Sequence, residues 1–123
     1  MICAVAIGRN EGQRLVCCLD SLLAAGFQRI VYVDSGSTDN SVAQAEAHGV
    51  TVVRLDMSSP FTAARARNAG VAALQDKEAD FIQFIDGDCI LDPSWLPQAF
   101  RFLMENPQVA VACGRLREVA PEV

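Results

Sequence analysis

The feature that most constrains this chain is the alternation of short apolar runs with longer segments of helical period. The runs are rich in β-branched residues and have few polar interruptions, which is typical of strands buried on both faces of a parallel sheet. The predicted strands are residues 2–7, 29–34, 51–55, 80–86 and 109–116. This pattern predicts an α/β fold.

Two of the segments between these runs carry apolar residues at positions i, i+4, i+7 and i+8, the spacing that forms one face of a helix. The two stripes are Leu15, Leu19, Leu22 and Leu23, and Leu96, Phe100, Leu103 and Met104. Both stripes predict helices that pack on the sheet. Gly26 and Gly49 are predicted to end helices, while residues 58–60 and 91–93 supply a capping residue followed by a first-turn proline.

The predicted strands and helices alternate from a first strand to a fifth. With right-handed crossovers, this order gives a doubly wound, Rossmann-like and mostly parallel sheet with helices on both faces. A length of 123 residues suits one such domain, so we expect residues 1–123 to form a single domain. Ligands of these sheets bind beyond the carboxyl ends of the strands, so the residues that follow each strand are the candidates for function.

Composition excludes several classes of function. The net charge is -5 and no cluster of Lys and Arg is present, so we expect no nucleic-acid partner. No apolar run approaches the roughly 20 residues of a transmembrane helix, and the N-terminus lacks a signal-peptide pattern, which together predict a cytoplasmic location. The five cysteines lack the spacing of a zinc site and predict reduced, mostly buried thiols.

Two carboxylates lie at the end of the fourth predicted strand, where Asp86 is the last strand residue and Asp88 follows it, with Gly87 between them. Residues two apart in an extended chain project to the same side, so the carboxylates can converge, and Gly87 leaves room for a ligand to approach. Such oxygen ligands favour Mg²⁺ or Mn²⁺, which need only one or two carboxylates when a substrate phosphate completes the site. The alternative is that the pair only forms a turn, and Asp92 is expected to cap the next helix.

Polar residues also follow the first two predicted strands, as "GRNEG" at 8–12 and "DSGSTDNS" at 34–41. Parallel strands place both segments at the same edge of the sheet as the two carboxylates. Asp34 ends a predicted central strand, where its carboxylate could accept a hydrogen bond from a nucleotide base or ribose. The Ser, Thr and Asp residues after it could instead close a turn and cap the following helix.

Two arginines, Arg65 and Arg67, lie in the predicted helix over "ARARNAG" at 64–70. They are two positions or about 200° apart on the helix, so we expect one to be solvated and the other to face the site. An arginine there, together with Asn68, could bind an anionic diphosphate, because its planar guanidinium matches phosphate oxygens.

Taken in chain order, "RNEG", "VDSGSTDNS", "ARNAG" and "IDGD" resemble the nucleotide-binding half of the GT-A fold, and more narrowly glycosyltransferase family 2. The resemblance spans residues 2–116. It implies an inverting enzyme that transfers a sugar from a nucleoside-diphosphate sugar to an acceptor hydroxyl with the help of Mg²⁺ or Mn²⁺. The acceptor would be a saccharide or a lipid-linked molecule, and a full-length protein could lie at the membrane surface.

The same resemblance implies a role for each motif residue. Those implied to contact the nucleotide are Ile7, Gly8, Asn10, Glu11, Asp34, Arg67, Asp86 and Gly87. Asp34 would bond the base, and Arg67 the base or the diphosphate. Asp88 would be the main metal ligand, with Asp86 near the ribose and the metal. The family's catalytic base normally lies well C-terminal of these residues, so we expect a chain truncated at its C-terminus that holds only the donor and metal site.

Other classes of protein fit the motifs less well. A non-catalytic nucleotide-binding module remains an alternative, since no catalytic base is predicted within the chain. A magnesium-dependent phosphohydrolase of the haloacid dehalogenase type would carry its paired aspartates after the first strand, as would a phosphoacceptor receiver domain. A dinucleotide-binding module would need G-x-G-x-x-G after the first strand, where this chain has "GRNEGQ".

Overall fold

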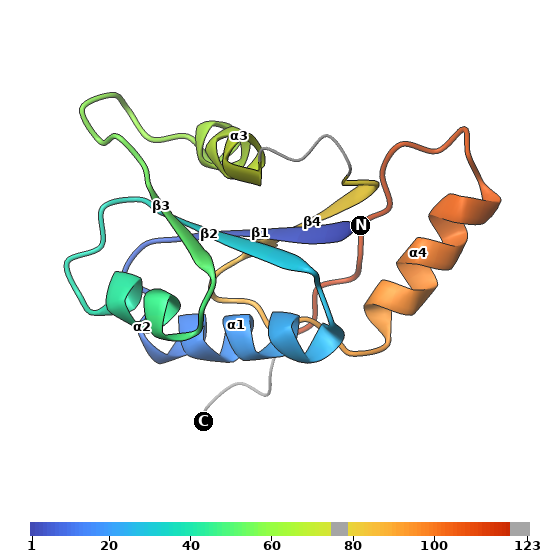
Figure 1. Cartoon of the computed structure of the whole chain (residues 1–123), viewed down its shortest axis with the longest axis horizontal. Helices are drawn as coiled ribbons and strands as arrows, with labels where there is room; N and C mark the ends of the chain where they lie inside the picture. Colours follow the sequence, from blue (N-terminus) through green and yellow to red (C-terminus); the bar gives the residue numbers. More distant parts are fainter. Residues whose placement is uncertain (75–78, 119–123) are drawn as a thin grey trace. The chain divides into compact units, whose positions relative to one another are not determined.

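The computed structural model of this chain describes residues 1–74 and 79–118, in which strands and helices alternate (Figure 1). The strands are β1 (Ile2–Gly8), β2 (Arg29–Asp34), β3 (Thr51–Arg54) and β4 (Phe81–Asp86), and the helices are α1 (Gln13–Ala25), α2 (Ser41–Ala47), α3 (Ala63–Leu74) and α4 (Trp95–Glu105). The chain divides into two compact units. The first, Met1–Leu91, holds the sheet and α1 to α3, and the second begins at Asp92 and holds α4.

All four strands of the sheet are parallel, in the order β3-β2-β1-β4. In its register, Ala6 of β1 pairs with Tyr32 of β2 on one side and with Ile85 of β4 on the other. Helices α1 and α2 cover one face of this sheet and α3 covers the other (Figure 1). The predicted α/β class, with a parallel sheet between helices on both faces, is confirmed.

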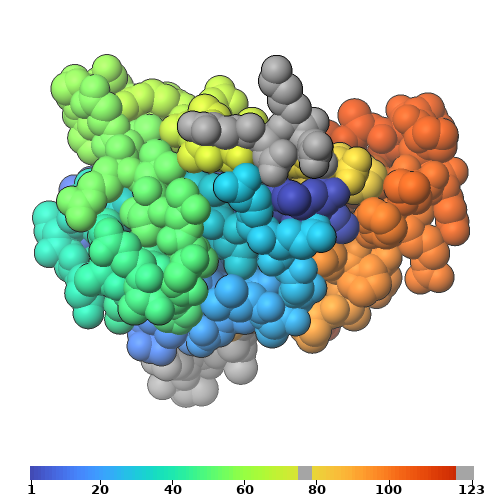
Figure 2. All heavy atoms as spheres, viewed as in Figure 1, coloured from blue at the N-terminus to red at the C-terminus, as the bar shows by residue number. Residues whose placement is uncertain are grey.

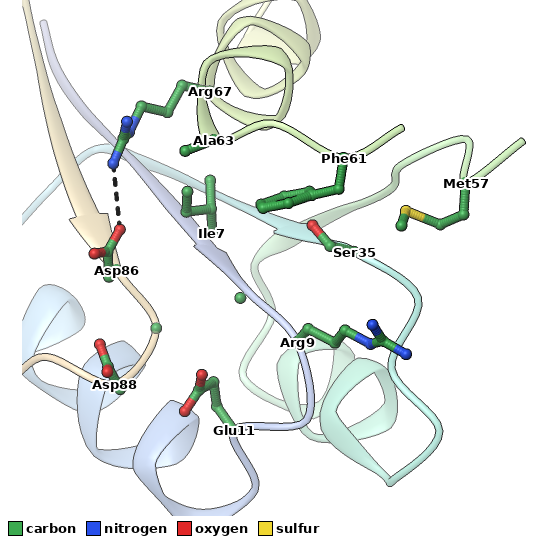
Figure 3. Close-up of a pocket in the computed structure, with 12 residues that line it drawn as sticks. Ile7, Arg9, Glu11, Ser35, Met57, Phe61, Ala63, Arg67, Asp86 and Asp88 are labelled. Carbon is green, nitrogen blue, oxygen red and sulfur yellow. Dashed lines mark hydrogen bonds and ion pairs between the residues drawn. The ribbon is translucent and has the colours of Figure 1, made fainter. Parts of the chain in front are cut away.

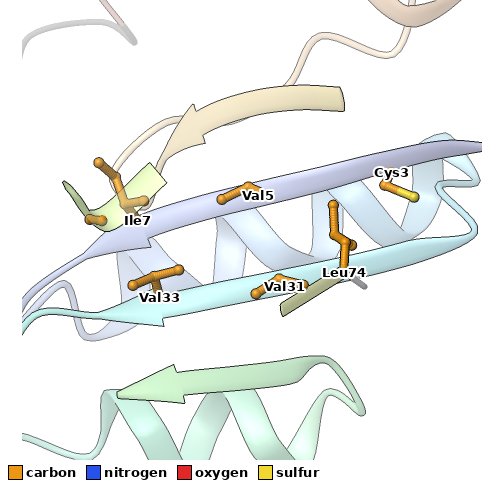
Figure 4. Packing of buried hydrophobic residues seen from close by; sticks show 7 residues of the cluster. Cys3, Val5, Ile7, Val31, Val33 and Leu74 are labelled. Atoms are coloured by element: carbon orange, nitrogen blue, oxygen red, sulfur yellow. The ribbon is translucent and has the colours of Figure 1, made fainter. Parts of the chain in front are cut away.

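The core lies on both faces of β1 and β2, because successive residues of a strand point to opposite faces. Cys3, Val5 and Ile7 of β1 form a cluster with residues of β2 and with Ala66 and Leu74 of α3 (Figure 4). The alternate strand residues project toward the other face, where Leu15, Leu19 and Leu22 of α1 are buried. The prediction of strands buried on both faces is therefore right for the two inner strands.

The outer strands differ from that prediction. β3 and β4 lie at the two edges of the sheet within the described residues, and neither contains a buried residue. β4 was expected to be buried on both faces like the other strands, but it is an edge strand of the described sheet and its Phe84 is 40% exposed. An apolar run predicts a strand but not its place in the sheet, because pairing order depends on contacts distant in sequence.

The predicted fifth strand is wrong. Residues 109–116 are described by the structure and form no strand, and Val111 and Leu116 in this segment are 72% and 85% exposed. A β-branched run forms a strand only where a neighbouring strand accepts its backbone hydrogen bonds. Helix α4, whose apolar stripe was expected to pack on the sheet, likewise contains no buried residue.

Two helix starts also differ from the sequence-based expectation. Helix α3 begins after Thr62, whose hydroxyl accepts a hydrogen bond from the Arg65 N–H at 3.0 Å, rather than within residues 58–60. Helix α4 begins at Trp95, after a turn in which the Asp92 carboxylate accepts the Ser94 N–H at 2.8 Å. The loop between β3 and α3 is consequently longer than predicted, and it projects from the surface of the first unit (Figure 2).

Candidate functional site

A pocket of about 360 Å³ lies at the carboxyl edge of the sheet (Figure 3). It lies where parallel α/β sheets bind their ligands. Residues from the ends of β1, β2 and β4 and from the β3–α3 region line it. They are Ile7, Gly8, Arg9, Glu11, Ser35, Met57, Phe61, Ala63, Arg67, Asp86, Gly87 and Asp88.

One side of the pocket is acidic. The carboxylates of Asp86 and Asp88 lie on this side with that of Glu11 (Figure 3). Asp86 and Asp88 are both exposed, whereas Glu11 pairs with Arg14 at 2.9 Å. Asp88 also accepts a hydrogen bond from the thiol of Cys89 at 3.4 Å. Burial and this contact with Asp88 raise the pKa of Cys89 to about 11, so its thiol keeps the proton that it donates.

The glycine between the two aspartates has a structural role in addition to the one that the sequence suggested. The Gly87 N–H donates to the Ile7 carbonyl at 2.7 Å, which turns the chain against the end of β1. A Cβ on Gly87 would lie 3.2 Å from that carbonyl oxygen and 3.6 Å from Cγ of Glu11. The missing side chain therefore allows two strand ends to meet, in addition to leaving the pocket open.

The two arginines of α3 have different partners. The Arg67 guanidinium lines the pocket and donates to Oδ1 of Asp86 at 3.4 Å (Figure 3). Arg65 is not among the pocket residues and contacts the preceding loop instead. Its guanidinium donates to the backbone carbonyls of Ser59 at 3.1 Å and Pro60 at 2.9 Å, and to that of Asp56.

The opposite side of the pocket is apolar, and sequence reasoning missed it. Met57, Phe61 and Ala63 line it, and Arg9 and Ser35 are further pocket residues that were not predicted. Phe61 is 49% exposed and Met57 is 41% exposed. The sequence did contain a signal for this apolar side: Met57 and Phe61 are two large apolar residues in a segment with neither strand nor helix periodicity. A short loop has no core in which to bury them, so they are expected at the surface.

Asp34 is not part of the pocket lining. It is only 3% exposed, and its carboxylate accepts hydrogen bonds from the Tyr32 hydroxyl at 2.7 Å, the Ser37 N–H at 2.9 Å and the Ser37 hydroxyl at 2.5 Å. These contacts shape the turn after β2 and satisfy a carboxylate that is withdrawn from water. Its predicted contact with a base stays a prediction.

Asn10 is also not part of the pocket lining. Its side chain and backbone connect two loops. Its side-chain oxygen accepts hydrogen bonds from the N–H groups of Thr38 at 2.7 Å and Asp39 at 3.3 Å, and its own N–H donates to the Ser37 hydroxyl at 2.9 Å. Asn10 has a φ of 53°, a left-handed conformation that Asn tolerates better than most residues. It links the loops that follow β1 and β2, so its direct contact with a nucleoside also stays a prediction.

The acidic side suits a metal that a substrate helps to bind. In the described part of the chain, no three His, Cys, Asp or Glu side chains are grouped so as to hold a metal ion by themselves. Two exposed carboxylates fit Mg²⁺ or Mn²⁺, which accept few protein ligands when phosphate oxygens and water complete the shell. The donor set therefore fits a divalent cation bound jointly with an anionic ligand.

The family to which this architecture belongs is shown by comparison with known families. The model of glycosyl transferase family 2 matches residues 4–121, nearly the whole chain and every residue of the pocket. The chain belongs to glycosyl transferase family 2. This confirms the resemblance noted in the sequence.

Solved structures similar to this family 2 chain share its fold. Glucosyl-3-phosphoglycerate synthase from Mycobacterium tuberculosis in complex with UDP has a TM-score of 0.70 and 26% identity, over 85% of this chain and 40% of that one. The same enzyme in complex with Mn²⁺, UDP and glucosyl-3-phosphoglycerate has a TM-score of 0.69 and 26% identity, over 84% and 39%. TarS 1-349 from S. aureus in complex with UDP-GlcNAc has a TM-score of 0.69 and 23% identity, over 86% and 32%.

The family 2 chain is short beside these structures. It spans about a third of the length of TarS 1-349 and about two fifths of the mycobacterial synthase. No curated protein matches the chain.

Proposed function

We propose that this chain is the donor-binding part of a glycosyltransferase that transfers a sugar from a nucleoside diphosphate to an acceptor hydroxyl. The observation that carries the proposal is the pocket itself. It places two exposed carboxylates and an arginine opposite an apolar wall, all at the carboxyl edge of a family 2 sheet. A nucleoside diphosphate has the matching parts, namely an anionic diphosphate and a flat, largely apolar base.

In this proposal the chain's own residues bind and orient the donor. Asp88, with Asp86 beside it, holds Mg²⁺ or Mn²⁺, and Arg67, on the same side of the pocket, binds diphosphate oxygens while its 3.4 Å contact positions Asp86. When bound, the cation neutralises the negative charge that develops on the departing diphosphate. Ile7 and Gly8 form the floor of the pocket, and Asp34 and Asn10 hold the adjoining loops in place.

The reaction would invert the anomeric centre if the acceptor hydroxyl attacks the sugar directly and a carboxylate removes its proton. We assign no residue to that base. The acceptor would be a saccharide or a lipid-linked molecule. Among the described residues, no helix has the length and apolar character needed to cross a bilayer.

Thermal denaturation in the presence of nucleotides tests the proposal. UDP, GDP and dTDP are each added with and without Mn²⁺, with UDP as the first choice because the mycobacterial synthase was solved with UDP and Mn²⁺. A ligand at 100 times its dissociation constant stabilises the folded state by about 2.7 kcal/mol, so at least one diphosphate should raise the melting temperature in a Mn²⁺-dependent manner.

Two variants with the same change in charge sharpen this test. Asp88→Asn should abolish the Mn²⁺-dependent rise, whereas Asp20→Asn, on the exposed side of α1, should preserve it. If no nucleoside diphosphate alters the parent's melting temperature, the donor site is wrongly assigned. If Asp88→Asn responds as the parent does, the metal role of Asp88 is wrong.

A further inference from the structure

The pocket is divided into a charged side and an apolar side. Asp86, Asp88 and Glu11 lie at one end, while Phe61 and Met57 lie at the other (Figure 3). The strand order β3-β2-β1-β4 produces this division, because it places the end of β4 and the β3–α3 loop on opposite sides of β1 and β2. A ligand that fills the pocket therefore meets charge at one end and an aromatic side chain at the other.

Phe61 is held in this exposed position by its own loop. The Arg65 guanidinium donates to the carbonyls of Ser59 and Pro60, the two residues immediately before Phe61, and also to that of Asp56. The Asp56 carboxylate in turn accepts the Ser58 N–H at 2.9 Å. Three carbonyls bound by one planar guanidinium leave the loop little conformational freedom, which reduces the entropy lost when a ligand binds against it.

Besides Phe61, the hydroxyl group of Ser35 at this end of the pocket is available to a ligand. Ser35, directly after β2, lines the pocket and is 4% exposed, and its hydroxyl has no hydrogen-bond partner among the described residues. Such buried hydroxyls are uncommon in folded proteins, because an unmet hydrogen bond is costly. A ligand with polar atoms at the edge of a flat apolar ring would complement both Ser35 and Phe61.

We propose that Phe61 stacks on the nucleobase of the donor and that Arg65 holds Phe61 in position for this contact. This inference rests on the proposed function, since it assumes a nucleoside diphosphate whose diphosphate lies at Asp86 and Asp88. The base lies against the ring of Phe61, beside Met57, with its edge toward the Ser35 hydroxyl. Arg65 does not touch the ligand and acts through the three carbonyls of the loop.

Calorimetric titration with UDP, GDP and inorganic pyrophosphate, each with saturating Mn²⁺, tests the role of Phe61. Phe61→Ala should weaken binding of the nucleoside diphosphate by about 5- to 150-fold, the range for losing an aromatic stacking partner, and should leave binding of pyrophosphate unchanged. Phe61→Tyr retains the ring face and should bind within about twofold of the parent. Leu23→Ala, which removes a side chain of similar exposure from α1, is the matched control and should change neither affinity.

The possible outcomes separate this inference from the proposed function. If the parent binds no nucleoside diphosphate, the proposed function fails and the inference fails with it. If the parent binds one and Phe61→Ala binds it equally well, only the inference is overturned. An equal loss of nucleotide and pyrophosphate affinity in Phe61→Ala would also overturn it, because the ring would then support the whole pocket rather than the base.

A double-mutant cycle tests whether Arg65 acts through Phe61. Arg65→Ala alone should weaken nucleoside diphosphate binding several-fold while leaving pyrophosphate binding intact, and Arg65→Lys should restore only part of the loss, since an ammonium group cannot reproduce the guanidinium fork. In the Phe61→Ala background, Arg65→Ala should cause no further loss. If the two losses add fully, Arg65 acts independently of Phe61 and the positioning role is wrong.

Discussion

At the scale of single residues, the end of β2 depends on a buried hydrogen-bond network. The Tyr32 hydroxyl donates to Asp34, whose carboxylate also holds the backbone and hydroxyl of Ser37. Burial raises the pKa of Tyr32 above its ordinary value, and the hydrogen bond and negative charge of Asp34 raise it further. The neutral phenol is the form that the fold requires, because a phenolate there would face a carboxylate at hydrogen-bond distance.

Titration of Tyr32 is therefore coupled to folding. A raised folded-state pKa stabilises the fold below the unfolded pKa of about 10, and this contribution is lost as the pH rises toward the higher folded-state value. Tyr32 is the only tyrosine in the chain, so the near-ultraviolet absorbance of tyrosinate reports this group alone.

We expect the native protein to develop no tyrosinate signal as the pH passes 10, whereas the protein in denaturant should titrate there. Far-ultraviolet circular dichroism recorded in parallel identifies any alkaline unfolding, with which the native signal should coincide. A native protein that titrates near pH 10 with its circular dichroism intact would show that the network around Asp34 is absent.

At the scale of elements, the close approach of α3 to the sheet holds the pocket together, because α3 carries both Arg65 and Arg67. Ala66, Gly70 and Leu74 recur one turn apart and are the buried residues of this helix. A Cβ on Gly70 would overlap Cγ1 of Val5 and lie 3.1 Å from Cγ2 of Val33. Small residues at 66 and 70 thus allow the helix to lie directly on β1 and β2.

Gly70→Ala should destabilise the protein although alanine is the better helix former by about 1 kcal/mol. Overpacking of a filled core typically costs about 1–3 kcal/mol, and the added methyl would meet the γ-methyl groups of Val5 and Val33, two fully buried side chains. Urea denaturation measures this change. Val71→Ala on the exposed side of the same helix is the control and should be close to neutral.

A second substitution that removes the side chain of Val5 tests whether the clash with Val5 causes the loss of stability in Gly70→Ala. In the Val5→Ala background, the added methyl of Gly70→Ala fills part of the cavity. The double variant should therefore lose less unfolding free energy than the two single variants lose in sum. Strict additivity would mean that the methyl does not meet Val5.

At the scale of the whole molecule, the chain consists of two compact units with different burial. Cys3 and Cys18 lie in the core of the first unit, and Cys113 of the second is exposed. Only two of the five cysteines are buried, fewer than predicted: Cys17 and Cys89 are half-buried, and Cys113 is exposed because its segment forms no strand. Burial raises the pKa of Cys18 to about 12, and nearby negative groups add to the effect.

Alkylation followed by peptide mass spectrometry should distinguish the two units. At pH 8 Cys113 should react quickly, whereas Cys3 and Cys18 should react only when the first unit unfolds, because a buried thiol is not accessible to the reagent. Cys113→Ser should remove the fast phase and leave the slow one. Labelling of Cys3 or Cys18 as fast as that of Cys113 in the native protein would contradict the core described for this unit.

The α/β alternation, the parallel character of the sheet and the position of Asp86 and Asp88 at the end of a strand could be predicted from the sequence. These properties follow from local periodicity, because whether a segment forms a strand or a helix depends largely on the spacing of its own apolar residues. The resemblance of four motifs to glycosyltransferase family 2 also came from local segments, and the family match confirms it. The roles of the motif residues toward a ligand stay predictions.

Which residues share the pocket could be learned only from the folded structure. It placed β4 at an edge, left residues 109–116 without a strand, turned Arg67 toward Asp86 and Arg65 toward the loop carbonyls, and brought Phe61 and Met57 to the site. Each of these outcomes depends on partners distant in sequence or on a loop that has no periodicity. Spacing along the chain carries no information about such partners, because they are set by tertiary packing and by hydrogen bonds between distant segments.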